Sequence, residues 1–178
     1  GPRVLAEAAA RAGIPLLHIS TDYVFDGTKA AAYGEDDPVA PLGVYGATKL
    51  AGEEAVRAAL PDHVILRTAW VYARNGRNFL KTMLKLAAER PELRVVADQR
   101  GCPTSADDIA IAILAVARAA GEGRARFGTY HFAGTGETTW HGFASRIVAE
   151  QAAFTGRQPP VVAIATADYP TPAKRPAN

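Results

Sequence analysis

The 178-residue sequence contains a single cysteine, Cys102, so no internal disulfide and no zinc cluster built from cysteines can form. One free thiol is typical of proteins kept in a reducing compartment, which predicts a cytoplasmic protein. The four histidines have none of the spacings typical of metal ligands, and we expect no metal site built on them.

The sequence also lacks a large excess of either sign of charge, and it lacks long apolar runs. The 20 Lys and Arg residues nearly balance the 18 Asp and Glu residues, giving a formal net charge of +2. The basic residues are scattered, so neither a nucleic-acid nor a membrane partner is expected. No apolar run approaches the roughly 18 residues that cross a bilayer. The first residues also lack the basic-then-apolar order of a signal peptide.

Apolar periodicity and turn residues predict strands that alternate with helices along the chain. Strands are expected at residues 14–19, 63–68, 93–97, 128–134 and 160–165, and helices at 4–12, 45–60, 78–90, 105–120 and 139–153. This order predicts an α/β fold, a Rossmann-like, mainly parallel sheet with helices on both faces.

Four polar residues, Ser20 to Tyr23, follow the apolar run "IPLLHI" directly. Open α/β sheets bind their ligands at the carboxyl ends of strands, so this position is a candidate site. A plain polar loop is the alternative.

Tyr45 and Lys49 are four residues apart in a predicted helix, which places both side chains on one face, about a turn apart. A positive charge close to a phenol favours its ionised form, and such a tyrosine can exchange a proton with a carbonyl or an alcohol. The lysine can also donate to a ribose hydroxyl. A surface tyrosine and lysine on an amphipathic helix remain the alternative, because the pair by itself is short.

Five ordered segments carry a resemblance to a known family: "STDYVFDG", "YGATKLAGEE", "LRTAWVYA", "NFLKTML" and "DQRGCPT". In this order and at these separations they resemble the dTDP-4-dehydrorhamnose reductase family, within the extended short-chain dehydrogenase/reductase superfamily. The resemblance extends through nearly the whole chain, to "YPTPAKRPAN". It implies NADPH- or NADH-dependent reduction of the 4-keto group of dTDP-4-dehydro-L-rhamnose to dTDP-L-rhamnose.

The resemblance also implies which residues form the catalytic and cofactor-binding sites. Tyr45 would donate a proton to the developing alkoxide, Lys49 would support Tyr45 and hold the nicotinamide ribose, and Thr21 would hydrogen-bond the keto oxygen. Thr68, at the end of the next predicted strand, is assigned to the cofactor side together with Tyr45 and Lys49.

Substrate contacts are implied for Thr21, Asp22, Trp70 and Asn78. Asp22 would meet sugar hydroxyls, Trp70 would form a flat apolar wall for the deoxysugar, and Asn78 would lie near the diphosphate. Each has a structural alternative: a turn-forming aspartate, a core tryptophan and a helix N-cap, respectively.

Arg100 and Asp107 are weaker candidates. Arg100 could meet a phosphate, although a solvated loop arginine is the commoner case. Asp107 lies where some family members carry an acidic residue associated with a magnesium-bridged dimer, but a carboxylate in the first turn of a helix also suits the helix dipole. We therefore expect no metal site in this chain itself, and leave Mg²⁺ at a homodimer contact open.

The sequence departs from the family in lacking the Gly-rich loop, G-x-x-G-x-x-G, that binds the cofactor pyrophosphate. We therefore expect a fold truncated at its N-terminal dinucleotide-binding half, lacking the extreme C-terminal region and inactive alone. Residues 1–72 would complete a Rossmann-like domain, and residues 73–178 would hold the rest of the sheet and a small, incomplete substrate-binding region. The choice between NADPH and NADH stays open, because the discriminating residue lies in the missing half.

Two alternatives to a reductase remain open. One is a nucleotide-sugar epimerase or dehydratase of the same superfamily, although a dehydratase would want an acid pair beside Thr21, where the sequence has Asp22-Tyr23. The other is a non-catalytic regulatory subunit of a methionine adenosyltransferase, since reductase-like chains serve in that role.

Overall fold

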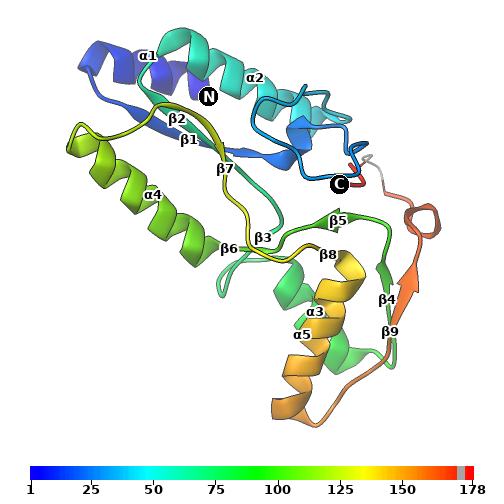
Figure 1. The fold of residues 1–178 in the computed structure, drawn as a ribbon. Helices are drawn as coiled ribbons and strands as arrows, with labels where there is room; N and C mark the ends of the chain where they lie inside the picture. Colours follow the sequence, from blue (N-terminus) through cyan, green and yellow to red (C-terminus); the bar gives the residue numbers. More distant parts are fainter. Residues whose placement is uncertain (172–174) are drawn as a thin grey trace.

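The structure, a computed structural model, describes residues 1–171 and 175–178. Its largest sheet is parallel, with the strand order β1-β2-β7 (Leu16–Thr21, His63–Thr68 and Gly128–His131). Figure 1 shows this sheet between two helices on one side and a third on the other: α1 (Pro2–Ala12), α2 (Val44–Ala59) and α4 (Ala106–Gly121).

Neighbouring residues of the central strand β2 show how the two faces of this sheet are covered. Ile65 is fully buried in a cluster with Ala6 of α1 and Val56 of α2. Val64, one residue earlier, lines a shared cavity with Val116 of α4. Because successive side chains of a strand point to opposite faces, helices cover both sides of the sheet, as the α/β pattern predicts.

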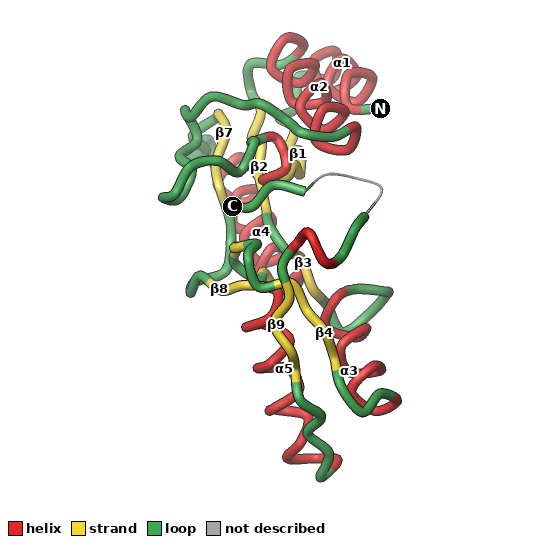
Figure 2. The backbone as a smooth tube through the Cα atoms, turned by 90° about the vertical axis from the view of Figure 1, so that its right-hand side faces the viewer, coloured by secondary structure: helices red, strands yellow, loops and turns green. Residues whose placement is uncertain are grey.

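A second group of elements forms its own core at the other end of the molecule (Figure 2). It consists of two helices and a parallel pair of strands: α3 (Phe79–Glu89), α5 (Trp140–Thr155), β4 (Leu93–Val96) and β9 (Val161–Ile164). The buried side chains of this core include Met83 of α3, Val95 of β4 and Ile147 of α5.

Short strands lie between the two groups, and each has only two residues. β3 (Val71–Tyr72) pairs in parallel with β6 (Thr104–Ser105), and β5 (Arg100–Gly101) pairs antiparallel with β8 (Thr138–Thr139). The described residues also include two short 3₁₀ helices, η1 (Asp22–Val24) and η2 (Thr166–Asp168). A two-residue strand has no periodicity, which explains why the sequence did not predict these pairings.

The predicted alternation of strands and helices is confirmed, with shifts at the ends of elements. The first strand extends to Thr21, two residues beyond the predicted end, because each of its residues pairs with β2. The division after residue 72 stays a prediction: α4 and β7, both from the later part of the chain, return to the first sheet.

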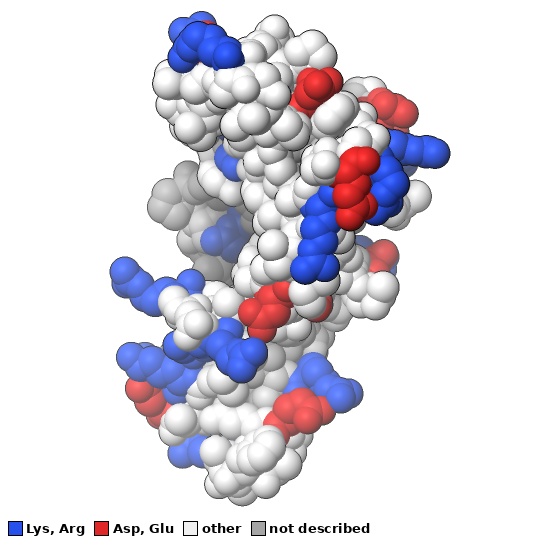
Figure 3. Space-filling model, turned by 90° about the vertical axis from the view of Figure 1, so that its left-hand side faces the viewer, with Lys and Arg blue, Asp and Glu red and all other residues white. Residues whose placement is uncertain are grey.

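On the face shown in Figure 3, basic and acidic side chains are interspersed. In the described part of the chain, no helix combines the length and apolarity that a bilayer crossing requires.

Candidate active site

At the carboxyl end of β1, the polar residues that follow the apolar run form hydrogen bonds with one another. The Thr21 hydroxyl donates to Asp22 Oδ1 at 2.8 Å and accepts from the backbone N–H of Tyr23 at 3.2 Å. This second bond caps η1, which turns the chain immediately after the strand. Thr21 is only 6% exposed, so its hydroxyl is held in one place at the edge of the sheet.

The first turns of α2 pack against the same segment. The Tyr45 and Tyr23 rings meet edge to face, with centroids 5.8 Å apart. One turn further along α2, Lys49 Nζ donates to the backbone oxygen of Ile19 at 2.6 Å. The structure therefore brings Tyr45 and Lys49 to the strand end that carries Thr21 and Asp22, and the 57% exposure of Tyr45 leaves its phenol accessible.

Gly46 permits this close approach. A Cβ at this position would overlap the backbone oxygen of Tyr23 and would lie 2.9 Å from Pro41 Cβ. Both neighbours are rigid, since one is backbone and the other is part of a proline ring. A side chain at residue 46 would therefore push α2 away from η1.

We predict that Gly46→Ala lowers the free energy of unfolding by about 1–3 kcal/mol, the usual cost of overpacking a tight contact. Denaturant unfolding of the full-length protein measures this change. Gly121→Ala, near the end of α4, is the matched control, because a Cβ there meets nothing within 4 Å. Equal effects of the two substitutions would contradict the tight contact at Gly46.

Thr68 and Trp70 come from the adjacent strand end. Thr68 is the Cα partner of Thr21 across the β1–β2 ladder, and its hydroxyl donates to the Ser20 oxygen at 3.5 Å. Trp70, two residues later, has a φ of 47°, a left-handed conformation that costs a bulky residue about 1–3 kcal/mol. Such strain is commonly found at functional positions, because the surrounding structure must hold it in place.

The Trp70 ring packs against other residues, so it is not a freely exposed apolar surface, but it also does not belong to either hydrophobic core. One face stacks on Trp140, with centroids 3.5 Å apart and an interplanar angle of 8°. A Cβ on Gly101 would lie 2.5 Å from Trp70 Cε2, so the backbone of β5 lies directly against the ring. Trp70 thus contacts both α5 and the backbone of β5.

Trp140 and Gln99 belong to this neighbourhood, although the sequence analysis did not select them. The Trp140 indole N–H donates to Gln99 Oε1 at 3.2 Å, and Gln99 Nε2 donates to Thr166 Oγ1 at 3.0 Å. Gln99 is 6% exposed and thus orients the stacked ring. The only sequence signal for these residues is their place beside Arg100 and after the N-cap Thr139, and that signal is weak.

Asn78 occupies the N-cap of α3, the structural alternative raised by its sequence position. Its Oδ1 accepts from the Lys81 N–H at 3.2 Å, and its Nδ2 donates to the oxygens of Ala73 and Asn75 at 2.7 and 3.2 Å. These bonds use both amide hydrogens. A diphosphate contact by Asn78 remains a prediction and would have to displace one of them.

Arg100 and Asp107 both form exposed ion pairs. Arg100 pairs with Glu137 at 2.7 Å, and Asp107 pairs with Arg74 at 3.1 Å. Among the described residues, no group of three or more His, Cys, Asp and Glu side chains could hold a metal ion. The magnesium expectation at Asp107 therefore gains no support from this geometry.

Burial changes the acidity of Asp22. Loss of solvent raises its pKa to about 6, and hydrogen bonds from Thr21 and from backbone N–H groups only partly oppose this rise. The pKa of Cys102 is also raised, first by burial and then by the charges of Glu137 and Asp22. Cys102 directly follows β5, whose Gly101 lies against Trp70.

A folded-state pKa above the unfolded value predicts a definite pH dependence. Asp22 ionises near pH 4 in the unfolded chain and near pH 6 in the folded protein, so its contribution to stability falls as pH rises across this window. Asp22→Asn keeps an acceptor for Thr21 and removes the titration. We expect the free energy of unfolding of the variant, relative to the wild type, to be higher at pH 7 than at pH 4.5. Denaturant unfolding at both pH values tests this; a difference independent of pH would contradict the buried titration.

Comparisons of the sequence with protein families and with known proteins all point to one family. The family model for the RmlD substrate binding domain matches residues 1–178. A dTDP-4-dehydrorhamnose reductase of Sinorhizobium fredii is 52% identical over 180 residues, covering 100% of this chain and 61% of its own length. A reductase of the same name from Salmonella typhimurium is 46% identical, covering 98% of this chain and 59% of its own.

Solved structures give the same result. A dTDP-4-dehydrorhamnose reductase from Bacillus anthracis, solved in complex with NADP, superimposes with a TM-score of 0.89 at 37% identity, over 99% of this chain and 59% of that one. A dTDP-4-dehydrorhamnose reductase from Clostridium acetobutylicum has a TM-score of 0.89 at 42% identity, with the same coverage. The chain thus spans about three-fifths of the length of the relatives that it matches.

Proposed function

Because the chain belongs to the RmlD substrate binding domain family, we propose that the full-length protein reduces dTDP-4-dehydro-L-rhamnose to dTDP-L-rhamnose with NADPH or NADH. The observation that carries this proposal is the packing of Tyr45 and Lys49 against the Ile19–Tyr23 segment. This packing supports the proposal because a phenol, an ammonium group and the Thr21 hydroxyl then lie near the carboxyl end of a parallel strand, where such sheets bind ligands.

The residues present suit a nicotinamide cofactor. A lysine ammonium has three N–H donors, and Lys49 uses one of them on the Ile19 oxygen, which leaves two for the ribose hydroxyls. Tyr45 is exposed and can approach the substrate oxygen. When bound, the nicotinamide supplies the hydride that reduces carbon 4 of the sugar. NADP in the Bacillus anthracis relative supports NADPH as the donor.

The proton comes from Tyr45. As negative charge develops on the former keto oxygen, the Tyr45 hydroxyl transfers its proton to that oxygen, and the C4 alcohol forms. Lys49 stabilises the resulting phenolate by its positive charge. The hydride and this proton together convert the keto group into the alcohol, and the Tyr45 phenolate, which is exposed, regains its proton from solvent.

Thr21 and Asp22 act on the substrate together. In the structure the Thr21 hydroxyl donates its hydrogen to Asp22 Oδ1. When sugar hydroxyls approach, the Asp22 carboxylate accepts hydrogen bonds from them and frees the Thr21 hydroxyl for the keto oxygen. Thr68 lies on the cofactor side, and the Trp70 indole, held in place by its stack on Trp140, supplies a flat apolar surface for the deoxysugar.

The test is nicotinamide oxidation by the full-length protein. We expect oxidation of NADPH or NADH that depends on dTDP-4-dehydro-L-rhamnose and yields dTDP-L-rhamnose, with UDP-linked 4-keto sugars as the control. A folded protein that changes the sugar without consuming the cofactor would instead be an epimerase or dehydratase. A folded protein without turnover would contradict the proposal and favour a regulatory role.

A cytoplasmic location is part of this proposal, supported by the single free cysteine, Cys102. A homodimer remains a prediction.

A further inference from the structure

We infer that the buried ion pair between Glu53 and Arg67 positions the proposed catalytic groups relative to one another. This inference rests on the proposed function of Tyr45 and Lys49. Tyr45, Lys49 and Glu53 follow each other at intervals of four residues along α2, so all three lie on one face of the helix. Tyr45 meets Tyr23, Lys49 meets Ile19, and Glu53 enters the protein interior.

Glu53 makes a two-pronged contact with Arg67 of β2. Arg67 Nε donates to Glu53 Oε1 at 3.0 Å, and Arg67 Nη2 donates to Glu53 Oε2 at 2.8 Å. The side chains are 0% and 4% exposed, respectively. Burial alone would raise the pKa of Glu53, but the hydrogen bonds and charge of Arg67, helped by Ser20 and Arg57, lower it overall. The carboxylate is therefore charged, and the planar fork fixes its direction.

The same guanidinium also holds the segment that carries Thr21 and Asp22. Arg67 lies over the Phe25 ring, 5.1 Å from its centroid, and Phe25 is 2% exposed. Phe25 follows η1 directly and is further packed by Tyr33, whose ring stacks on it at 4.3 Å. One side chain of β2 thus contacts both α2, which provides the tyrosine and lysine, and the segment that provides the hydroxyl and carboxylate.

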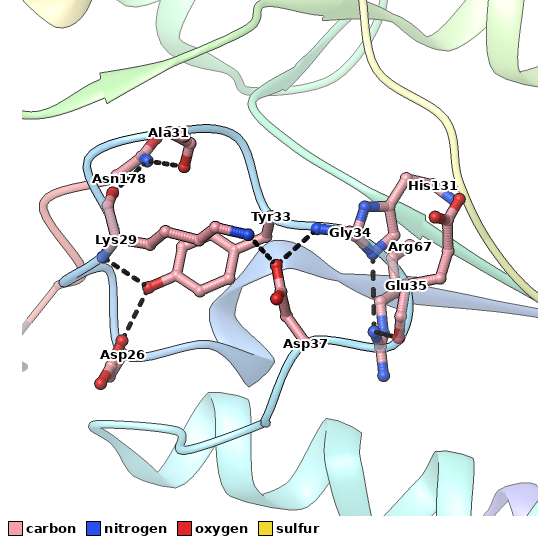
Figure 4. Close-up of polar contacts among 10 residues, drawn as sticks. All are labelled: Asp26, Lys29, Ala31, Tyr33, Gly34, Glu35, Asp37, Arg67, His131 and Asn178. Carbon is pink, nitrogen blue, oxygen red and sulfur yellow. Dashed lines mark hydrogen bonds and ion pairs between the residues drawn. The ribbon is translucent and has the colours of Figure 1, made fainter.

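The remaining donor atom of Arg67 is engaged as well, as Figure 4 shows. Arg67 Nη1 donates to the backbone oxygen of Glu35 at 3.3 Å and lies 3.5 Å from His131 Nε2. Glu35 is itself fastened to the sheet, because its Oε1 accepts from the His131 N–H at 2.9 Å. The guanidinium is therefore held from three sides and has one orientation.

Glu53 cannot take part in the reaction itself. Two helical turns separate it from Tyr45, about 12 Å along the axis. Its effect must pass through the rotation and depth of α2 against the sheet. Misplacing a reacting group by about 1 Å can cost about 10²-fold in rate, so a small rotation of α2 is enough to matter.

Glu53→Gln in the full-length protein tests this role, because glutamine keeps the shape and removes the charge. We expect kcat for NADPH-dependent reduction of the dTDP-4-keto sugar to fall about tenfold or more, with KM for the sugar nucleotide changed less than about threefold. Glu54→Gln is the matched control: it removes an exposed carboxylate from the adjacent position of α2 and should leave kcat unchanged.

A double variant separates positioning from stability. Glu53→Met combined with Arg67→Met replaces the pair by apolar side chains, which often preserves or increases stability. We expect this variant to unfold at about the wild-type temperature and still to show the tenfold loss in kcat, because the directional fork is gone. A stable double variant with wild-type kcat would overturn the inference, as would a Glu53→Gln enzyme whose kcat per folded molecule is unchanged.

These outcomes are distinct from failure of the proposed function. If Tyr45→Phe abolishes turnover while Glu53→Gln leaves it intact, the function stands and the positioning inference falls. If Tyr45→Phe is fully active, the proposed chemistry itself is wrong.

Discussion

Replacing Tyr45 by phenylalanine in the full-length protein is expected to lower kcat by about 10²- to 10⁴-fold, the usual contribution of a positioned general acid. The substitution removes the phenol oxygen alone and keeps the ring that packs edge to face on Tyr23. Cofactor affinity should therefore change little, because Lys49 and its bond to the Ile19 oxygen are untouched. Steady-state kinetics and a fluorescence titration with NADPH measure the two quantities separately.

Tyr130→Phe provides the control for loss of a tyrosine hydroxyl elsewhere. Tyr130 lies on β7, and its hydroxyl donates to the Arg126 oxygen at 3.1 Å. We expect wild-type turnover from this variant. Turnover by Tyr45→Phe close to that of the control would show that another group supplies the proton.

The sequence predicted the fold class well because the main elements follow strong local rules. β2 contains an apolar run at residues 64–66 and ends at Thr68, and α3 begins after the N-cap Asn78, so both elements carry their own signals. β3, β5, β6 and β8 were missed because each depends on pairing with a distant segment of the chain. Such pairings are set by tertiary structure, which a local pattern does not contain.

The candidate site was predicted in part, for a similar reason. The four-residue spacing of Tyr45 and Lys49 fixes them on one helical face, and the structure places that face against the end of β1. Extending the same spacing by four would have selected Glu53. Its partner Arg67, in an otherwise apolar strand, was the matching signal: a buried arginine implies a buried acid.

The contacts between the two groups of elements could not be predicted from the sequence. The stacking of Trp70 on Trp140 joins residues 70 positions apart, and Gln99 fixes it through a third segment. The positive φ of Trp70 has no sequence signal, because local preference disfavours it in a tryptophan. Strain of this kind is imposed by the surrounding structure.

The largest expected effect on stability follows from replacing only one member of the buried Glu53–Arg67 ion pair. Arg67→Met leaves the Glu53 carboxylate inside the protein without its main partner, and we expect the free energy of unfolding to fall by about 3–5 kcal/mol at pH 7. Denaturant unfolding of the full-length protein measures the loss. Adding Glu53→Met should recover most of it, since no buried carboxylate then remains and Arg57 is partly exposed to solvent.

The pH dependence of this loss has the opposite sign to that of Asp22. The pKa of Glu53 is lowered in the folded wild type, so the pair stabilises the protein above the unfolded pKa and its contribution disappears as pH falls through the lower, folded value. In Arg67→Met the Glu53 carboxyl keeps Arg57 as its charged partner but loses the buried one, so it takes up a proton more readily, which removes the cost of burying a charge. The difference between wild type and variant should therefore shrink as pH decreases from 7 to 4. A difference that stays constant over this range would mean that Arg67 stabilises the fold through its packing on Phe25 and not through its charge.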